Sequence, residues 1–117
     1  MPSITRPAAR NATRKPPPRR RVLLGGLIVY GNGAFTCDCT FRNLSSAGAR
    51  IAVKQLLQLP DHFYVINVHD GVAYFSRLVW NDGLEIGIKI ESVVQLNARD
   101  DYLTSRLKKL WLSKAPG

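Results

Sequence analysis

The sequence lacks any long apolar run and contains little cysteine. No stretch of its 117 residues approaches the roughly 18 to 20 apolar residues that a membrane-spanning helix requires. Its two cysteines, Cys37 and Cys39, are too few for a disulfide-stapled scaffold, and no Cys-x-x-Cys or His-x-x-His spacing offers a metal cage. We therefore expect no membrane partner, no bound metal and no cofactor.

Acidic residues are also scarce, and the excess of positive charge is concentrated at one end of the chain. There are 17 basic and 8 acidic residues, for a net charge of +9. Residues 1–21 hold seven of the basic residues, five of the seven prolines and no acidic residue. Such a segment cannot bury enough apolar surface to offset the entropy of ordering it, so we expect a mobile basic arm. It contains no apolar segment typical of secretory signals, which predicts a cytoplasmic protein.

The rest of the chain is rich in β-strand patterns. Residues 34–42 and 84–91 alternate strictly between apolar and polar side chains, which is typical of strands with one buried face. Further strands are expected at Val22–Tyr30, 49–54, Phe63–His69 and Val72–Trp80. The first, third and fourth of these have blurred alternation, which indicates strands covered on both sides for part of their length. Turn sequences such as Asn32-Gly33 and Asp70-Gly71 separate neighbouring strands. These patterns predict a mainly β protein, a six-stranded antiparallel β-barrel over residues 22–96.

A helix is expected after the barrel, over residues 97–113. Leu96, Leu103, Leu107 and Leu110 share one helical face, and Asn97 is suited to cap the first turn. We expect this C-terminal α-helix to pack its leucine stripe on the barrel.

Residues suited to catalysis are not grouped in the sequence. His62 and His69 have no partner at the spacing of a metal site or a catalytic dyad, and the carboxylates are scattered through turns and polar strand faces. Cys37 and Cys39 share the apolar face of one strand, where we expect two core thiols. The sequence therefore predicts a binding protein and not an enzyme.

One polar segment, residues 42–49, joins two of the expected strands. Asn43 and Ser45 can bond neighbouring amides, and Gly48 allows a positive φ and a close backbone approach. Successive N–H groups in such a turn can form a nest for an anionic oxygen.

These features together resemble the PilZ domain family, bacterial receptors for cyclic di-GMP. The family has Arg-x-x-x-Arg ahead of its first strand and Asp/Asn-x-Ser-x-x-Gly after its second. Residues 43–48 match the second motif, residues 19–26 resemble the entry to the first strand, and Val79-Trp80 with residues 87–91 resemble the closing strands. The resemblance covers residues 14–91 and implies a PilZ-like split barrel. It implies a ligand site made of Arg14, Lys15, Arg19, Arg20, Asn43, Ser45 and Gly48.

The first motif departs from the family pattern. Counted back from the strand, it is Lys15-x-x-x-Arg19. Intact Arg-x-x-x-Arg spacings lie further upstream, at Arg10–Arg14 and at Arg6–Arg10. We prefer the Lys15/Arg19 register and keep the Arg10/Arg14 register as the alternative. A lysine supplies positive charge to a phosphate but lacks the planar guanidinium of arginine. The adjacent Arg14 would have to supply that guanidinium in place of Lys15.

The resemblance implies that the arm folds over cyclic di-GMP and passes the signal to a protein effector. One alternative is a degenerate PilZ domain that has lost the ligand and acts as a protein–protein adaptor. Another is a small basic barrel that binds nucleic acid, which we disfavour because the expected outward residues form no basic and aromatic strand face.

Overall fold

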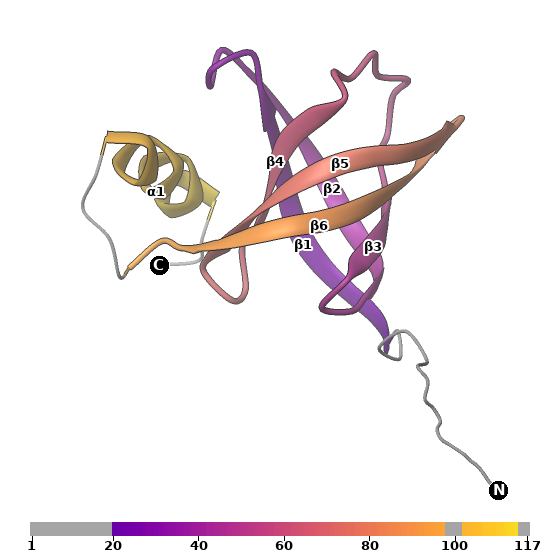
Figure 1. Cartoon of the computed structure of the whole chain (residues 1–117), viewed down its shortest axis with the longest axis horizontal. Helices are drawn as coiled ribbons and strands as arrows, with labels where there is room; N and C mark the ends of the chain where they lie inside the picture. Colours follow the sequence, from indigo (N-terminus) through magenta and orange to yellow (C-terminus); the bar gives the residue numbers. More distant parts are fainter. Residues whose placement is uncertain (1–19, 98–101, 115–117) are drawn as a thin grey trace, which may run out of the picture.

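The computed structural model describes residues 20–97 and 102–114, which form a closed β-barrel and one helix (Figure 1). The strands are β1 (Arg20–Tyr30), β2 (Phe35–Leu44), β3 (Gly48–Ala52), β4 (His62–Asn67), β5 (Val72–Asp82) and β6 (Glu85–Gln95), followed by α1 (Tyr102–Lys114). They pair in the order β1-β2-β3-β6-β5-β4, and β1 closes the barrel by pairing with β4. Every pair is antiparallel, so the predicted fold class is confirmed.

Two apolar cores explain why some strands alternate and others do not. One core fills the barrel interior with side chains such as Phe41, Ile51 and Val65. The second lies on the outer side of β1, β4 and β5 and includes Leu27 and Ile66. These three strands thus bury side chains on both faces, as their blurred patterns predict.

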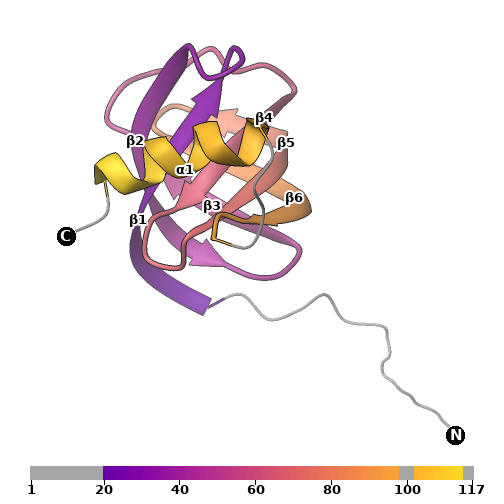
Figure 2. The same cartoon turned by 90° about the vertical axis from the view of Figure 1, so that its left-hand side faces the viewer.

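The helix α1 packs on the outer side of β1, β4 and β5, in front of the strands in Figure 2. Leu107 is buried in the second core together with Leu96, which lies just after β6. Trp111 donates an Nε1–H hydrogen bond of 2.8 Å to the carbonyl of Val68. Lys114 Nζ lies 3.1 Å from Asp38 Oδ1. Among the described residues, no helix is long and apolar enough to cross a membrane.

Most element boundaries differ from the expected ones by one to four residues: β2, β5 and β6 extend further, to Leu44, Asp82 and Gln95, and β3 and β4 end earlier, at Ala52 and Asn67. β1 begins at Arg20, two residues before the expected strand, because Arg20 and Arg21 already pair with the end of β2. The remainder of the expected arm, residues 1–19, lies outside the described residues. The helix is described from Tyr102, and residues 98–101 are likewise outside, so the cap expected at Asn97 stays a prediction.

Candidate functional site

The Asn-x-Ser-x-x-Gly segment lies beside the first residues of β1. In the β1–β2 ladder, Arg20 is opposite Leu44 and Arg21 is opposite Asn43. β1 therefore begins, at Arg20, next to this turn (Figure 1). Of the expected ligand residues at this end of the chain, Arg14, Lys15 and Arg19 lie outside the described residues, and Arg20 is placed by its backbone in β1.

Ser45 organises the turn between β2 and β3. Its Oγ accepts hydrogen bonds of 3.2 Å from the N–H groups of Ala47 and Gly48, and it donates one of 3.3 Å to the carbonyl of Gly48. The N–H of Ser45 donates a further bond of 2.9 Å to the same carbonyl. The expectation that this turn offers an open nest to an anion is therefore wrong for these two amides, because the oxygen that they bind belongs to Ser45 itself.

Gly48 is required by close packing and not by its φ. It is not among the residues with positive φ, so that part of the expectation is wrong. A Cβ built on Gly48 would lie 2.5 Å from the carbonyl oxygen of Ile88 on β6, closer than carbon and oxygen pack. The expected close backbone approach is thus present, between β3 and β6.

Asn43 and Arg50 face each other across the β2–β3 ladder with unused polar atoms. Both Asn43 Oδ1 and Arg50 Nε are buried and have no hydrogen-bond partner among the described residues. Arg50 Nε lies 3.7 Å from Glu85 Oε1, an ion pair too long for a hydrogen bond. A polar ligand could therefore donate a hydrogen bond to Asn43 Oδ1 and accept one from Arg50 Nε.

Two residues of this region, Arg50 and Trp80, were not predicted as site residues from the sequence. Arg50 on β3 pairs with Gly87 on β6, and Gly87 pairs with Trp80 on β5. The Trp80 indole covers Gly87, since a Cβ at that position would overlap the ring. Trp80 is nevertheless 40% exposed. Asn43, Arg50, Gly87 and Trp80 thus form one row across the outside of the barrel, which we call the cross-strand row.

Two basic residues, Lys89 and Arg77, lie beside the cross-strand row. Lys89 is opposite Gly48, and Arg77 is opposite Lys89. Arg77 Nε lies 3.5 Å from Glu91 Oε2, and both side chains are exposed enough for water to weaken the pair. The surface around the turn therefore combines cations, an exposed indole and two polar atoms, Asn43 Oδ1 and Arg50 Nε, that have no hydrogen-bond partner among the described residues.

The other residues considered for chemistry are not brought together. Cys37 and Cys39 are free thiols, and burial raises the pKa of both, most strongly that of Cys39, which suits core packing and not reactivity. His62 and His69 are exposed and lie at opposite ends of β4. Within residues 20–97 and 102–114, no group of three or more His, Cys, Asp or Glu side chains could hold a metal ion.

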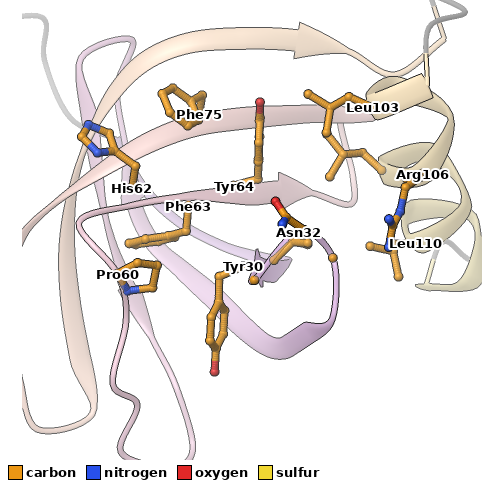
Figure 3. Close-up of a pocket in the computed structure, with 14 residues that line it drawn as sticks. Tyr30, Asn32, Pro60, His62, Phe63, Tyr64, Phe75, Leu103, Arg106 and Leu110 are labelled. Carbon is orange, nitrogen blue, oxygen red and sulfur yellow. The ribbon is translucent and has the colours of Figure 1, made fainter.

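No protein-family model matches this chain, and no curated protein is similar to it. A cavity of about 650 Å³ is present in the fold, but it lies elsewhere, between α1 and the barrel (Figure 3). The β2–β3 turn and the cross-strand row are therefore the candidate binding surface.

Proposed function

We propose that this chain is a PilZ-like receptor domain that binds cyclic di-GMP, and that it works by binding and not by catalysis. The observation that carries the proposal is the pairing of Arg20 and Arg21 with Leu44 and Asn43. It brings the arginine-rich chain to the Asn-x-Ser-x-x-Gly turn, next to a buried amide oxygen of Asn43 that has no partner among the described residues.

The chemistry of the ligand matches the groups in this region. Cyclic di-GMP has two phosphates and two guanines, whose N–H groups donate and whose O6 and N7 accept. Asn43 Oδ1 is suited to a guanine N–H, and the exposed indole of Trp80 offers a face for stacking a base. Arg50 and Lys89 supply positive charge for a phosphate.

Within this proposal the residues of the expected site divide into two roles. Ser45 and Gly48 shape the turn, since their polar and steric requirements are already met inside the protein. Asn43, Arg20, Arg19 and Lys15 or Arg14 contact the ligand, and the arm orders over it. An ordered arm then presents a new surface to a protein effector.

The decisive experiment is a calorimetric titration of the purified protein with cyclic di-GMP. Arg19→Ala should weaken binding tenfold or more, because each charge-assisted hydrogen bond contributes about 1.5–3 kcal/mol. Lys15→Arg should tighten binding, since it adds a planar fork without changing the charge. Lys109→Ala, an exposed change on α1, is the matched control and should bind like wild type.

The motif register gives a second, independent outcome. If the Arg10/Arg14 register is the one used, Arg10→Ala becomes the damaging change and Lys15→Arg is silent. Absence of heat at high micromolar cyclic di-GMP would reject the proposal outright.

An adaptor function is the second candidate, and a different surface favours it. Three large apolar side chains are exposed here: Leu56 (75%), Val79 (57%) and Leu84 (49%). Apolar side chains grouped on a surface, unlike single scattered ones, are typical of protein interaction sites. Their segments are tied together, because Val53 N–H bonds the carbonyl of Leu84 and Asn81 Nδ2 bonds that of Leu57. This alternative is supported if the protein does not bind cyclic di-GMP and if Leu84→Lys abolishes its binding to a protein partner.

A further inference from the structure

The exposed indole of Trp80 has charged side chains around it. The strands β3, β6 and β5 lie side by side, with Arg50 opposite Gly87 and Gly87 opposite Trp80 (Figure 1). Glu85 and Lys89 are two residues before and two residues after Gly87 on β6, so they share its outer face. The indole therefore lies on a face that has an acidic residue towards one end of the barrel and a basic residue towards the other.

The indole covers Gly87 with its ring face. A Cβ on Gly87 would overlap Nε1, Cε2 and Cδ1 of Trp80, all three within 2.8 Å. An approach along the ring plane would leave Cε2 and Cδ1 clearly further away than Nε1, so the contact is made from above the ring. The opposite ring face is then turned to solvent, in agreement with the 40% exposure of Trp80. A nucleobase can stack on such a face.

Glu85 and Arg50 place a carboxylate beside a guanidinium next to the indole. Arg50 Nε lies 3.7 Å from Glu85 Oε1, and each side chain is 42% exposed. This distance is too long for a hydrogen bond, so the carboxylate oxygens can still accept N–H groups of a ligand. A carboxylate only accepts and a guanidinium only donates, so the pair presents acceptors next to donors in a fixed order.

This order of acceptors and donors matches guanine and not adenine. Guanine donates through N1–H and N2–H, and the neighbouring O6 accepts. Adenine has the opposite pattern, because its N1 accepts and its N6–H groups donate. Lys89 is opposite Gly48 and therefore lies towards the β2–β3 turn, on the far side of Gly87 from Glu85. A base whose N1–H points to Glu85 has its sugar and phosphate on the side of Lys89.

We propose that Glu85 determines the base specificity of this chain by accepting the N1–H and N2–H groups of a guanine stacked on Trp80. Arg50 donates to O6 of the same base, and its charge also favours the nearby phosphate. The inference rests on the proposed function, since it names the groups that recognise one guanine of cyclic di-GMP. Asn43 lies beyond Arg50 in the cross-strand row and is left for the second guanine.

The test compares cyclic di-GMP with cyclic di-AMP by calorimetric titration of the full chain. Wild type should bind cyclic di-GMP about tenfold or more tightly than cyclic di-AMP, the discrimination expected of one bidentate base contact. Glu85→Gln keeps the side-chain size and replaces one acceptor by an amide N–H, which suits adenine. It should weaken cyclic di-GMP and strengthen cyclic di-AMP, so that the preference falls about fivefold or more. Glu91→Gln removes the same charge from the same strand and should leave the preference unchanged.

Tryptophan fluorescence tests the base site separately, with 5′-GMP and 5′-AMP as probes. The chain has two tryptophans, and Trp111 is held on α1 by its hydrogen bond to the Val68 carbonyl. Stacking of 5′-GMP should quench the wild-type emission more than 5′-AMP does at the same concentration, and Trp80→Phe should abolish the quenching. Glu85→Gln should remove the difference between the two nucleotides.

The inference and the proposed function fail in different ways. If cyclic di-GMP binds but Glu85→Gln and Glu91→Gln show the same preference, the proposed function stands and Glu85 is not the specificity residue. If neither cyclic dinucleotide binds, the proposed function is wrong, and the role of Glu85 is upheld only if 5′-GMP quenches Trp80 more than 5′-AMP does. Equal quenching by the two nucleotides, or none by 5′-GMP, overturns the inference.

Discussion

The assignment of separate roles to Asn43 and Ser45 predicts opposite effects of two small substitutions in the same turn. Ser45→Ala removes an oxygen that accepts two backbone N–H groups. Asn43→Ala removes an amide oxygen that has no partner among the described residues. Both changes keep the Cβ atom, so they differ mainly in the hydrogen bonds that they delete. The first should affect folding, and the second should affect ligand binding.

The magnitudes follow from the contacts. Each neutral hydrogen bond contributes about 0.5–1.5 kcal/mol, and water replaces part of that in the half-exposed turn, so Ser45→Ala should lower the unfolding free energy by about 1–2 kcal/mol. Asn43→Ala loses little packing and relieves an unsatisfied buried acceptor, so its unfolding free energy should stay within about 0.5 kcal/mol of wild type. Loss of one bond to a guanine N–H should weaken cyclic di-GMP binding about fivefold.

Urea unfolding followed by tryptophan fluorescence measures the first quantity, and calorimetric titration measures the second. Ser45→Ala should retain an affinity within about twofold of wild type when the protein is kept folded. Asn43 and Ser45 do not have separate roles if Asn43→Ala destabilises the protein as much as Ser45→Ala does, or if Asn43→Ala leaves the affinity for cyclic di-GMP unchanged.

Two further predictions concern the barrel. Gly48→Ala should lower the unfolding free energy by about 1–3 kcal/mol because its Cβ meets the Ile88 carbonyl, whereas Gly25→Ala, with nothing within 4 Å, should be tolerated; equal melting temperatures would contradict the close approach. Burial is the main cause that raises the pKa of Cys39, and the neighbouring Cys37 and Asp38 add to it. The thiol therefore stays protonated in the folded protein, whereas in the unfolded chain it ionises above its ordinary pKa of 9.0. Stability should therefore be intact below pH 9.0 and fall above it by up to about 1.4 kcal/mol per pH unit for this thiol, and urea titrations of Cys39→Val should show a shallower fall.

Local patterns in the sequence were sufficient for the strands and the turns. The alternation of Phe41 and Ile88 with polar neighbours identifies inward faces, and the turn at Asn32-Gly33 has the positive φ values that its sequence predicts. The two-sided burial of β1 was also readable, because Leu27 and Ile28 are adjacent and both buried. These features depend on residues close together in the chain.

Features formed by strands that are far apart in the sequence could not be predicted from local patterns. Trp80 could have been placed opposite Gly87 by counting back from the β5–β6 turn, but the pairing of Arg50 with Gly87 joins β3 to β6 and no local pattern specifies it. The cavity likewise combines Tyr30, Tyr64 and Arg106 from three separate segments. Satisfaction of the turn amides by Ser45 depends on a side-chain rotamer that residue type alone does not determine.

The way the barrel closes has a consequence for a chain leaving the ribosome. β1 pairs with β2, which follows it directly in the chain, and its other edge pairs with β4, where Gly26 is opposite Asn67. Until β4 is synthesised, that edge is an open template on which another chain could add a strand. Proline and positive charge deter such addition, and the segment that runs into β1 is rich in both, at residues 16–18 and 19–21. We expect this proline and this positive charge to make strand addition at the edge of the nascent barrel less favourable.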